Sequence, residues 1–183
     1  MNPINESILI ERCRAGESVA FGPLIKLYRK QLYSYLYRFG GDKNLAEDLF
    51  QETLIKVWRS LPKYNEQNKF SSWLFSIAHN TAMDALRKKQ KNKLLNDLED
   101  TELIPGRSNP HDELIYKETA ESISKVVDLL PVKQKEVFLL RINGELTFKE
   151  IAEITGEPLN TVLSHMHYSV KKIKKIVGSD YAK

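Results

Sequence analysis

Acidic and amide side chains gather on adjacent turns of the stretch NLAEDLFQETLIKVW, residues 44–58. Paired carboxylates could serve acid–base catalysis or hold a metal ion. A di-metal Glu-x-x-His pattern would need histidines on the same helical face, and this stretch has none, so we expect no metal and no other cofactor. Lys56 can relieve the repulsion between the carboxylates. The face is either simply solvated or binds a basic or polar partner, and such docking is the favoured function. This candidate docking face consists of Glu47, Asp48, Gln51 and Glu52.

The stretch FSSWLFSIAHNTAMDALRKK, residues 70–89, separates into two helical faces. An apolar stripe predicts a buried side made of Phe70, Leu74, Ile77, Ala78, Thr81 and Ala85. A polar stripe is made of Ser76, Asn80, Asp84, Arg87, Lys88 and Lys91. Short hydrogen-bonding groups at one end and cations at the other suit DNA bases and phosphates, although many polar stripes are only solvated. Trp73 is either a core anchor, which is favoured, or a platform on which an unpaired base stacks.

The stretch LTFKEIAEITGEPLNTVLSHMHYSVKKIKK, residues 146–175, predicts a helix, a tight turn and a second helix. Ala152, Gly156 and Val162 stand where such a motif needs a small crossing residue, a flexible turn and an inward apolar side chain. Pro158 suits the start of the second helix, because its missing N–H costs nothing there. The layout is typical of helix-turn-helix DNA-binding proteins, although an ordinary helical hairpin would show the same pattern.

In a DNA-binding version, side chains near the start of the second helix face the major groove. Asparagine can bind adenine there, and serine can meet a phosphate or a base edge. The lysines that follow could bind phosphates, or could only be solvated at a helix end whose dipole favours cations. The candidate DNA-binding residues are Asn160, Thr161, Ser164, His165, Tyr168, Lys171 and Lys172.

Helices on both sides of a central linker would position these stretches. Apolar periods predict helices over residues 21–36, 43–61, 70–89, 111–130 and 132–142, besides the two of the turn motif. Gly40, Gly41, Asp42, Pro62, Asn143 and Gly144 supply helix stops and caps. The stretch 91–113 is acidic and holds two prolines, without a sustained apolar period. We therefore expect an all-α protein with two small domains, 1–92 and 113–183, joined by a flexible linker, 93–112.

Composition excludes several classes of protein. The 183 residues contain 28 Lys and Arg against 24 Asp and Glu, an excess that is compatible with a polyanionic partner. No apolar run approaches the ~20 residues of a membrane span, and the N-terminus has no signal-peptide layout. Cys13 stands alone, so an internal disulfide is excluded. We expect a cytoplasmic protein without membrane insertion.

Three stretches, in this order, resemble the extracytoplasmic-function (ECF) group of bacterial RNA polymerase sigma factors. They are AEDLFQETLIKVW, FSSWLFSIAHNTAMDALR and LLPVKQKEVFLLRINGELTFKEIAEITGEPLNTVLSHM. One alone would be a weak signal, whereas the resemblance covers nearly the whole chain. It implies a first helical domain that grips the clamp helices of core polymerase and opens promoter DNA at the minus-ten element. A second domain would sit on the polymerase flap and bind the minus-thirty-five element.

The resemblance also implies roles for single residues. Asp48, Gln51 and Glu52 would bind polymerase, and the helix-turn-helix residues would bind the minus-thirty-five element. The linker would thread toward the polymerase active centre, and many relatives are held silent by an anti-sigma factor, so such a partner is expected. A loop over residues 62–69 would help to hold a flipped base. The minus-ten residues would be Tyr64, Asn65, Ser76, Asn80, Asp84, Arg87 and Lys88.

The second helix of the turn motif departs from the family's usual sequence, which is close to Gly-Thr-Val-Lys-Ser-Arg after the proline. Asn160 replaces the glycine and Leu163 replaces a basic residue, while His165 and Tyr168 replace arginines. Fewer cations predict weaker phosphate anchoring and a shallower salt dependence.

Two alternatives belong to other functional classes. A dimeric helix-turn-helix regulator that binds duplex operators without polymerase would account for residues 146–175, but would leave 44–58 and 70–89 unused. A small helical enzyme would need a phosphate-binding glycine loop, a Cys/His cluster with metal spacing, or a nucleophile–base pair. The sequence offers none of these, so we expect no enzymatic activity.

Overall fold

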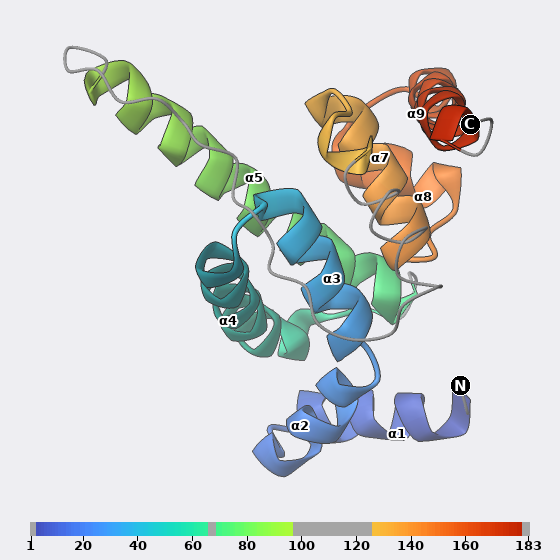
Figure 1. The fold of residues 1–183 in the computed structure, drawn as a ribbon. Coiled ribbons are helices and arrows are strands. Elements are labelled where there is room, and N and C mark those ends of the chain that lie inside the picture. Colours follow the sequence, from blue (N-terminus) through green and yellow to red (C-terminus); the bar gives the residue numbers. More distant parts are fainter. Residues whose placement is uncertain (1–2, 66–68, 97–125, 181–183) are drawn as a thin grey trace. The chain divides into compact units, whose positions relative to one another are not determined.

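The computed structural model describes residues 3–65, 69–96 and 126–180. In these ranges every regular element is a helix (Figure 1), which agrees with the predicted all-α class. The chain divides into two compact units, residues 1–98 and 99–183. Most of the predicted linker, 93–112, and most of the helix predicted over 111–130 lie outside the described residues.

The first unit begins with two helices that pack on each other. α1 (Pro3–Arg14) contacts α2 (Ser18–Lys26) and the short 3₁₀ turn η1 (Leu61–Lys63). The hydroxyl of Tyr28, just beyond α2, donates a 2.5 Å hydrogen bond to the carboxylate of Glu6 on α1. Burial, reinforced by this hydrogen bond, raises the pKa of Tyr28. α1 is therefore held both by packing on α2 and by the hydrogen bond to the residue that follows it.

The single helix predicted over residues 21–36 is wrong, because the structure has two helices there. α2 ends at Lys26, and α3 (Arg29–Gly40) begins three residues later. The N–H groups of Leu27 and Tyr28 donate to carbonyls only three residues back, the tight geometry common at helix ends. The apolar residues before and after the break enter the same core. The helical spacing of apolar residues therefore continues across the break, and the sequence pattern does not reveal it.

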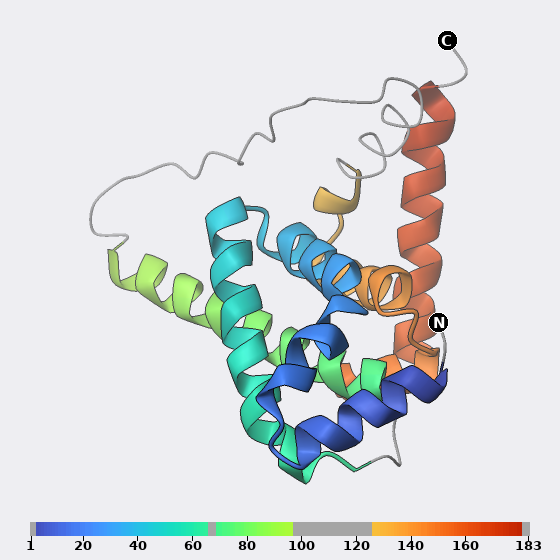
Figure 2. The ribbon, with the colours of Figure 1, turned by 90° about the horizontal axis from the view of Figure 1, so that it is seen from below.

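Three helices that follow α2 build the main core of the first unit. α3, α4 (Lys43–Ser60) and α5 (Phe70–Asn96) all contact one another, and Figure 2 shows α5 projecting beyond the other two. Each fully buried leucine contributes roughly 1.5–3 kcal/mol. α5 continues through four residues that were predicted to belong to the linker. The completely buried side chains include Leu32, Tyr35, Leu36, Ala46, Val57, Leu74 and Ala78.

The ends of these helices follow the predicted caps. Gly41 takes the left-handed conformation, with φ of 73°, after the last turn of α3. Asp42 then accepts a 2.8 Å hydrogen bond from the N–H of Leu45 at the start of α4, an N-cap worth about 1 kcal/mol. Pro62 follows the end of α4 within η1. Local sequence therefore determines where α4 begins and ends.

The second unit contains the predicted turn motif. α7 (Val132–Asn143) and α8 (Phe148–Thr155) both pack against the long α9 (Leu159–Asp180). Thr147 and Glu150 form a reciprocal capping box at the start of α8, and Gly156 has φ of 68° in the turn. The helix-turn-helix geometry is therefore confirmed, and its core includes Val127, Leu139, Leu140, Leu146, Ile151 and Val162.

Candidate functional site

The predicted docking face lies on the outer side of α4. Its four polar members, residues 47, 48, 51 and 52, are all exposed, whereas Ala46, Leu49, Thr53 and Val57 on the other side are buried. Ile55 is 52% exposed beside them. Sequence reasoning missed Ile55, although its spacing of three and four residues from Glu52 and Gln51 places it on the same face. The face therefore combines carboxylates, an amide and one large apolar side chain.

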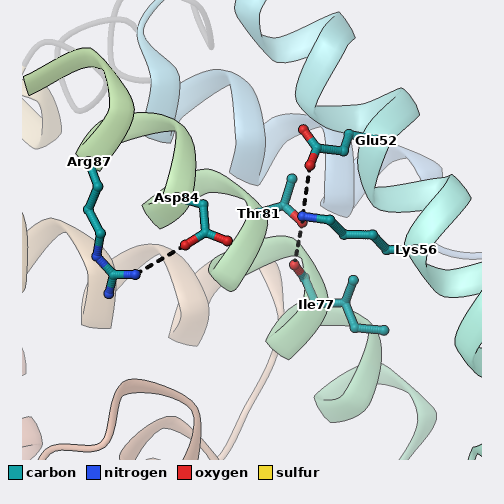
Figure 3. Close-up of polar contacts among 6 residues, drawn as sticks. All are labelled: Glu52, Lys56, Ile77, Thr81, Asp84 and Arg87. Carbon is teal, nitrogen blue, oxygen red and sulfur yellow. Dashed lines mark hydrogen bonds and ion pairs between the residues drawn. The ribbon is translucent and has the colours of Figure 1, made fainter. Parts of the chain in front are cut away.

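Lys56 connects this face of α4 to α5 (Figure 3). Its ammonium group lies 2.8 Å from the carboxylate of Glu52 and donates a 3.1 Å hydrogen bond to the hydroxyl of Thr81. Thr81 in turn donates to the carbonyl of Ile77 at 2.8 Å. The predicted relief of Glu52 by Lys56 is confirmed. The contact with Thr81 was missed, because no sequence period relates residues on two different helices.

The polar stripe of α5 points outward as predicted. Asn80, Asp84, Arg87, Lys88 and Lys91 are exposed. A guanidinium nitrogen of Arg87 lies 3.1 Å from the Asp84 carboxylate (Figure 3), which leaves it further N–H donors for a phosphate or a base. The stripe presents one amide, then an acid–base pair, then cations.

Ser76 is less available than the rest of the predicted stripe. It is half-buried, and its hydroxyl donates a 2.7 Å hydrogen bond to the carbonyl of Trp73 in its own helix. The oxygen of Ser76 can still accept a hydrogen bond from a DNA base, since a hydroxyl has two lone pairs.

Aromatic side chains form a cluster beneath the loop that precedes α5. The ring of Tyr64 lies 4.8 Å from that of Trp73 and 5.5 Å from that of Phe70, measured between centroids. Tyr64 is only 5% exposed, so its ring is packed inside rather than presented to DNA as predicted. Trp73 is half-buried in the same cluster, which supports its interpretation as a core anchor. Asn65 is exposed, and residues 66–68 of the loop lie outside the described residues.

A buried polar contact that sequence reasoning missed lies behind the stripe. The hydroxyl of Tyr35 on α3 and Nδ1 of His79 on α5 are 3.1 Å apart. His79 is the residue before Asn80, so the contact helps to set the rotation of α5 and the outward direction of its stripe.

The outer face of α9 carries most of the predicted helix-turn-helix residues. Asn160, Ser164, Tyr168 and Lys171 are exposed, while Thr161 and His165 are half-buried. The opposite side is anchored by Val162 and Ser169, both completely buried. The hydroxyl of Ser169 lies 2.8 Å from the carbonyl of His165 in its own helix and 3.2 Å from the carbonyl of Gln134 on α7, and can donate its one proton to either. These anchors determine which side of α9 faces outward.

Lys172 has a different place from the one predicted. Its ammonium group donates a 2.6 Å hydrogen bond to the carbonyl of Leu129 in the turn before α7. The side chain is half-buried and holds α9 to that turn. Lys171, by contrast, is exposed, and its phosphate contact stays a prediction.

Ion pairs brace α7 against the turn motif. The ammonium group of Lys133 lies 3.4 Å from the carboxylate of Glu136, in α7, and 3.3 Å from that of Glu157, in the turn between α8 and α9. Partial burial opposes the charge of Lys133, but the two carboxylates outweigh it and raise its pKa. Arg141 donates a 2.6 Å hydrogen bond to the carbonyl of Leu146 and lies over the ring of Phe148. These contacts hold α7 to the start of α8 and to the turn between α8 and α9.

The part of the chain that the structure describes contains no group of three or more His, Cys, Asp or Glu side chains placed to hold a metal ion. Its helices are also too short or too polar to cross a membrane.

Two family models match the chain in the order of its two units. The model of sigma-70 region 2 matches residues 24–92, which include α4 and most of α5. The model of sigma-70 region 4 matches residues 116–173, which include α7, α8 and the first part of α9. Both candidate DNA-binding helices and the candidate docking helix therefore fall within sigma-factor regions.

Whole-chain relatives agree with these matches. The ECF RNA polymerase sigma factor SigW of Bacillus subtilis is 29% identical over 174 residues, which is 91% of this chain and 93% of SigW. The ECF RNA polymerase sigma-E factor of Haemophilus influenzae is 28% identical, with 89% of this chain and 90% of the relative covered.

Solved structures share the fold. The sigma factor RpoE of Bartonella quintana, in complex with the anti-sigma factor NepR, matches with a TM-score of 0.73 and 21% identity over 87% of this chain and 98% of that one. CnrH, in complex with the cytosolic domain of CnrY, matches with a TM-score of 0.68 and 20% identity over 96% and 99%. The matches of both units and the relatives along the whole chain lead to one conclusion: this protein belongs to the sigma-70 family and is an RNA polymerase sigma factor of the ECF group.

Proposed function

We propose that the outer face of α4 is the surface through which this sigma factor binds core RNA polymerase. One observation carries the proposal: Asp48, Gln51 and Glu52 are exposed on a helix whose opposite side is buried against α3 and α5. The carboxylates suit a basic partner surface, and Ile55 supplies an apolar contact at its edge. In this assignment the partner surface is the clamp helices of the polymerase.

The polar stripe of α5 is the proposed minus-ten surface. Asn80 would contact a base of the opened strand, and Arg87 and Lys88 would contact its phosphates. Asp84 orients Arg87 through their 3.1 Å contact, and Ser76 offers an acceptor. Asn65 would act with the loop before α5, while buried Tyr64 would position that loop by packing on Trp73.

The helix-turn-helix of the second unit is the proposed minus-thirty-five surface. The exposed start of α9 would enter the major groove, with Thr161 and His165 at its edges. The remainder of the unit would rest on the polymerase flap. The functional domains would comprise residues 1–92 and 113–183, with 93–112 as the linker between them.

The sigma-factor role has consequences for location and partners. The protein would act in the cytoplasm, where the polymerase works, and would contribute promoter choice and melting without catalysing a reaction itself. Both solved relatives are complexes, and the partner of RpoE is an anti-sigma factor. We therefore propose that an anti-sigma factor holds this protein silent until promoter recognition is required.

Binding to purified core polymerase tests the docking proposal. The full-length protein is expected to be retained by immobilised core, whereas the variant Asp48→Lys/Glu52→Lys should lose at least about tenfold in affinity, because each new lysine places like charges against a basic surface. The control variant Glu11→Lys/Glu153→Lys makes the same change in net charge at two exposed positions outside α4.

The control should bind core as the unmodified protein does. Equal retention of all three proteins would refute docking through α4. Failure of the unmodified protein to bind core, with binding to duplex DNA intact, would favour the free-standing helix-turn-helix regulator instead.

A further inference from the structure

The outer face of α9 has an unusual chemical composition for a DNA-binding surface. No arginine or lysine occurs between Leu159 and Val170. Guanine is bound in the major groove chiefly by arginine or lysine, which donate to O6 and N7 together. The first three turns of α9 therefore lack the usual guanine-binding groups. Its exposed side chains are Leu159, Asn160, Leu163, Ser164, His167 and Tyr168.

Leu163 is an apolar side chain that the fold holds toward solvent. It is 40% exposed although its neighbour Val162 is completely buried. Leu159, one turn earlier, is 38% exposed on the same side of the helix. The packing of Val162 and Ser169 against the rest of the unit prevents α9 from rotating to bury them. An exposed leucine gains from any apolar group that it can cover.

Base edges in the major groove offer one apolar group, the 5-methyl of thymine. Asn160 lies three residues before Leu163, and residues at this spacing are neighbours on a helix surface. The amide of Asn160 is exposed, and an amide can bind adenine through N6 and N7. An apolar contact beside an amide thus matches neighbouring A·T pairs rather than G·C pairs.

We propose that Leu163 determines specificity in this sigma factor by packing on thymine methyl groups of the upstream promoter element, with Asn160 bound to an adjacent adenine. The inference rests on the proposed role of α9 at the minus-thirty-five element. It assigns to that element a chemical identity: its pairs facing the start of α9 are A·T.

Replacement of thymine by deoxyuridine tests this assignment, because it removes only the methyl group. Full-length protein with core polymerase would select duplexes from a pool with randomised upstream and minus-ten elements. The selected duplex would be made again with deoxyuridine in the upstream element, or with deoxyuridine only in the spacer as a control. Burial of one methyl group corresponds to roughly a fourfold change in affinity, so a loss of that size is expected for the first duplex alone.

Two variants connect the methyl group to Leu163. Leu163→Ala should bind the thymine duplex with an affinity lower by about the same factor, and deoxyuridine should reduce its affinity no further. Leu163→Met, which keeps an apolar side chain of similar volume, should retain most of the sensitivity to the methyl group. The side chain at position 163 faces solvent, so neither substitution should alter the binding of core polymerase.

The outcomes separate the inference from the proposed function. Two results would overturn the inference while leaving α9 as the DNA-binding helix. One is a selected element without a recurrent thymine. The other is an equal loss of affinity with deoxyuridine in Leu163→Ala and in the unmodified protein. A holoenzyme that binds core but whose selected duplexes show no upstream preference would overturn the role of α9, and the inference with it.

Discussion

The ammonium group of Lys56 on α4 donates a 3.1 Å hydrogen bond to the hydroxyl of Thr81 on α5. Thr81 is 1% exposed, and its hydroxyl also donates to the carbonyl of Ile77. The Thr81 hydroxyl therefore accepts one hydrogen bond and donates another, without contact with water. Because Lys56 also pairs with Glu52, one side chain links the proposed docking face to the helix that carries the proposed minus-ten surface.

Removing the cation of Lys56 should destabilise the first unit. Lys56→Met leaves the Thr81 oxygen without its charged donor, and we expect a loss of about 1 kcal/mol in the free energy of unfolding, measured with urea. The matched control is Lys43→Met, whose 3.9 Å pair with Glu47 is highly exposed and should be worth at most about 0.5 kcal/mol. Equal losses in the two variants would show that the contact with Thr81 adds nothing.

Two glycine-to-alanine changes should have opposite effects on stability. A Cβ at Gly144 would meet the carbonyl oxygen of Leu140 at 2.7 Å and Cγ of Leu146 at 2.9 Å, so Gly144→Ala should cost about 1–3 kcal/mol. A Cβ at Gly22, inside α2, would meet nothing within 4 Å, so Gly22→Ala should stabilise by about 0.5–1 kcal/mol. Thermal unfolding of both variants, followed by circular dichroism, measures the sign of each change.

Tyr28 should make the protein sensitive to alkali. Burial and the hydrogen bond to Glu6 raise its pKa in the folded protein, whereas in the unfolded chain the same hydroxyl should ionise at about pH 10. Its stabilising contribution is therefore fully present below about pH 10 and is lost as the pH rises above it. Urea unfolding between about pH 8 and pH 11 should show a shallower alkaline decline in Tyr28→Phe, and an identical decline would contradict the assignment.

Two adjacent lysines of α9 should have different functions. Lys171 is exposed, and Lys171→Met should reduce the log–log salt slope of promoter binding by about 1 without a change in stability. Lys172 donates to the carbonyl of Leu129, so Lys172→Met should lower the free energy of unfolding by roughly 0.5–1 kcal/mol. Binding titrations at several salt concentrations and urea unfolding separate the two effects, and reversal of the pattern would contradict the structure.

Much of the fold was predictable because its signals are local. The cap at Asp42, the left-handed Gly41 and Gly156, and the apolar faces of α5 and α8 follow from residues within one or two turns. The break between α2 and α3 was not predictable, since the spacing of buried residues before and after it matches that of a continuous helix. The exposed polar stripes were also predictable, because a stripe opposite a buried face must point outward.

The sequence by itself determined the helical class, the sigma-factor family, and the outward position of Asp48, Glu52, Asn80 and Asn160. Tertiary structure decided which of the other candidates are accessible. Tyr64 entered an aromatic cluster, Lys172 bound a backbone carbonyl, and Lys56 reached Thr81 on another helix. The physical reason is that helical periodicity specifies the side of a helix on which a residue lies, whereas its partners across the core depend on how separate helices pack.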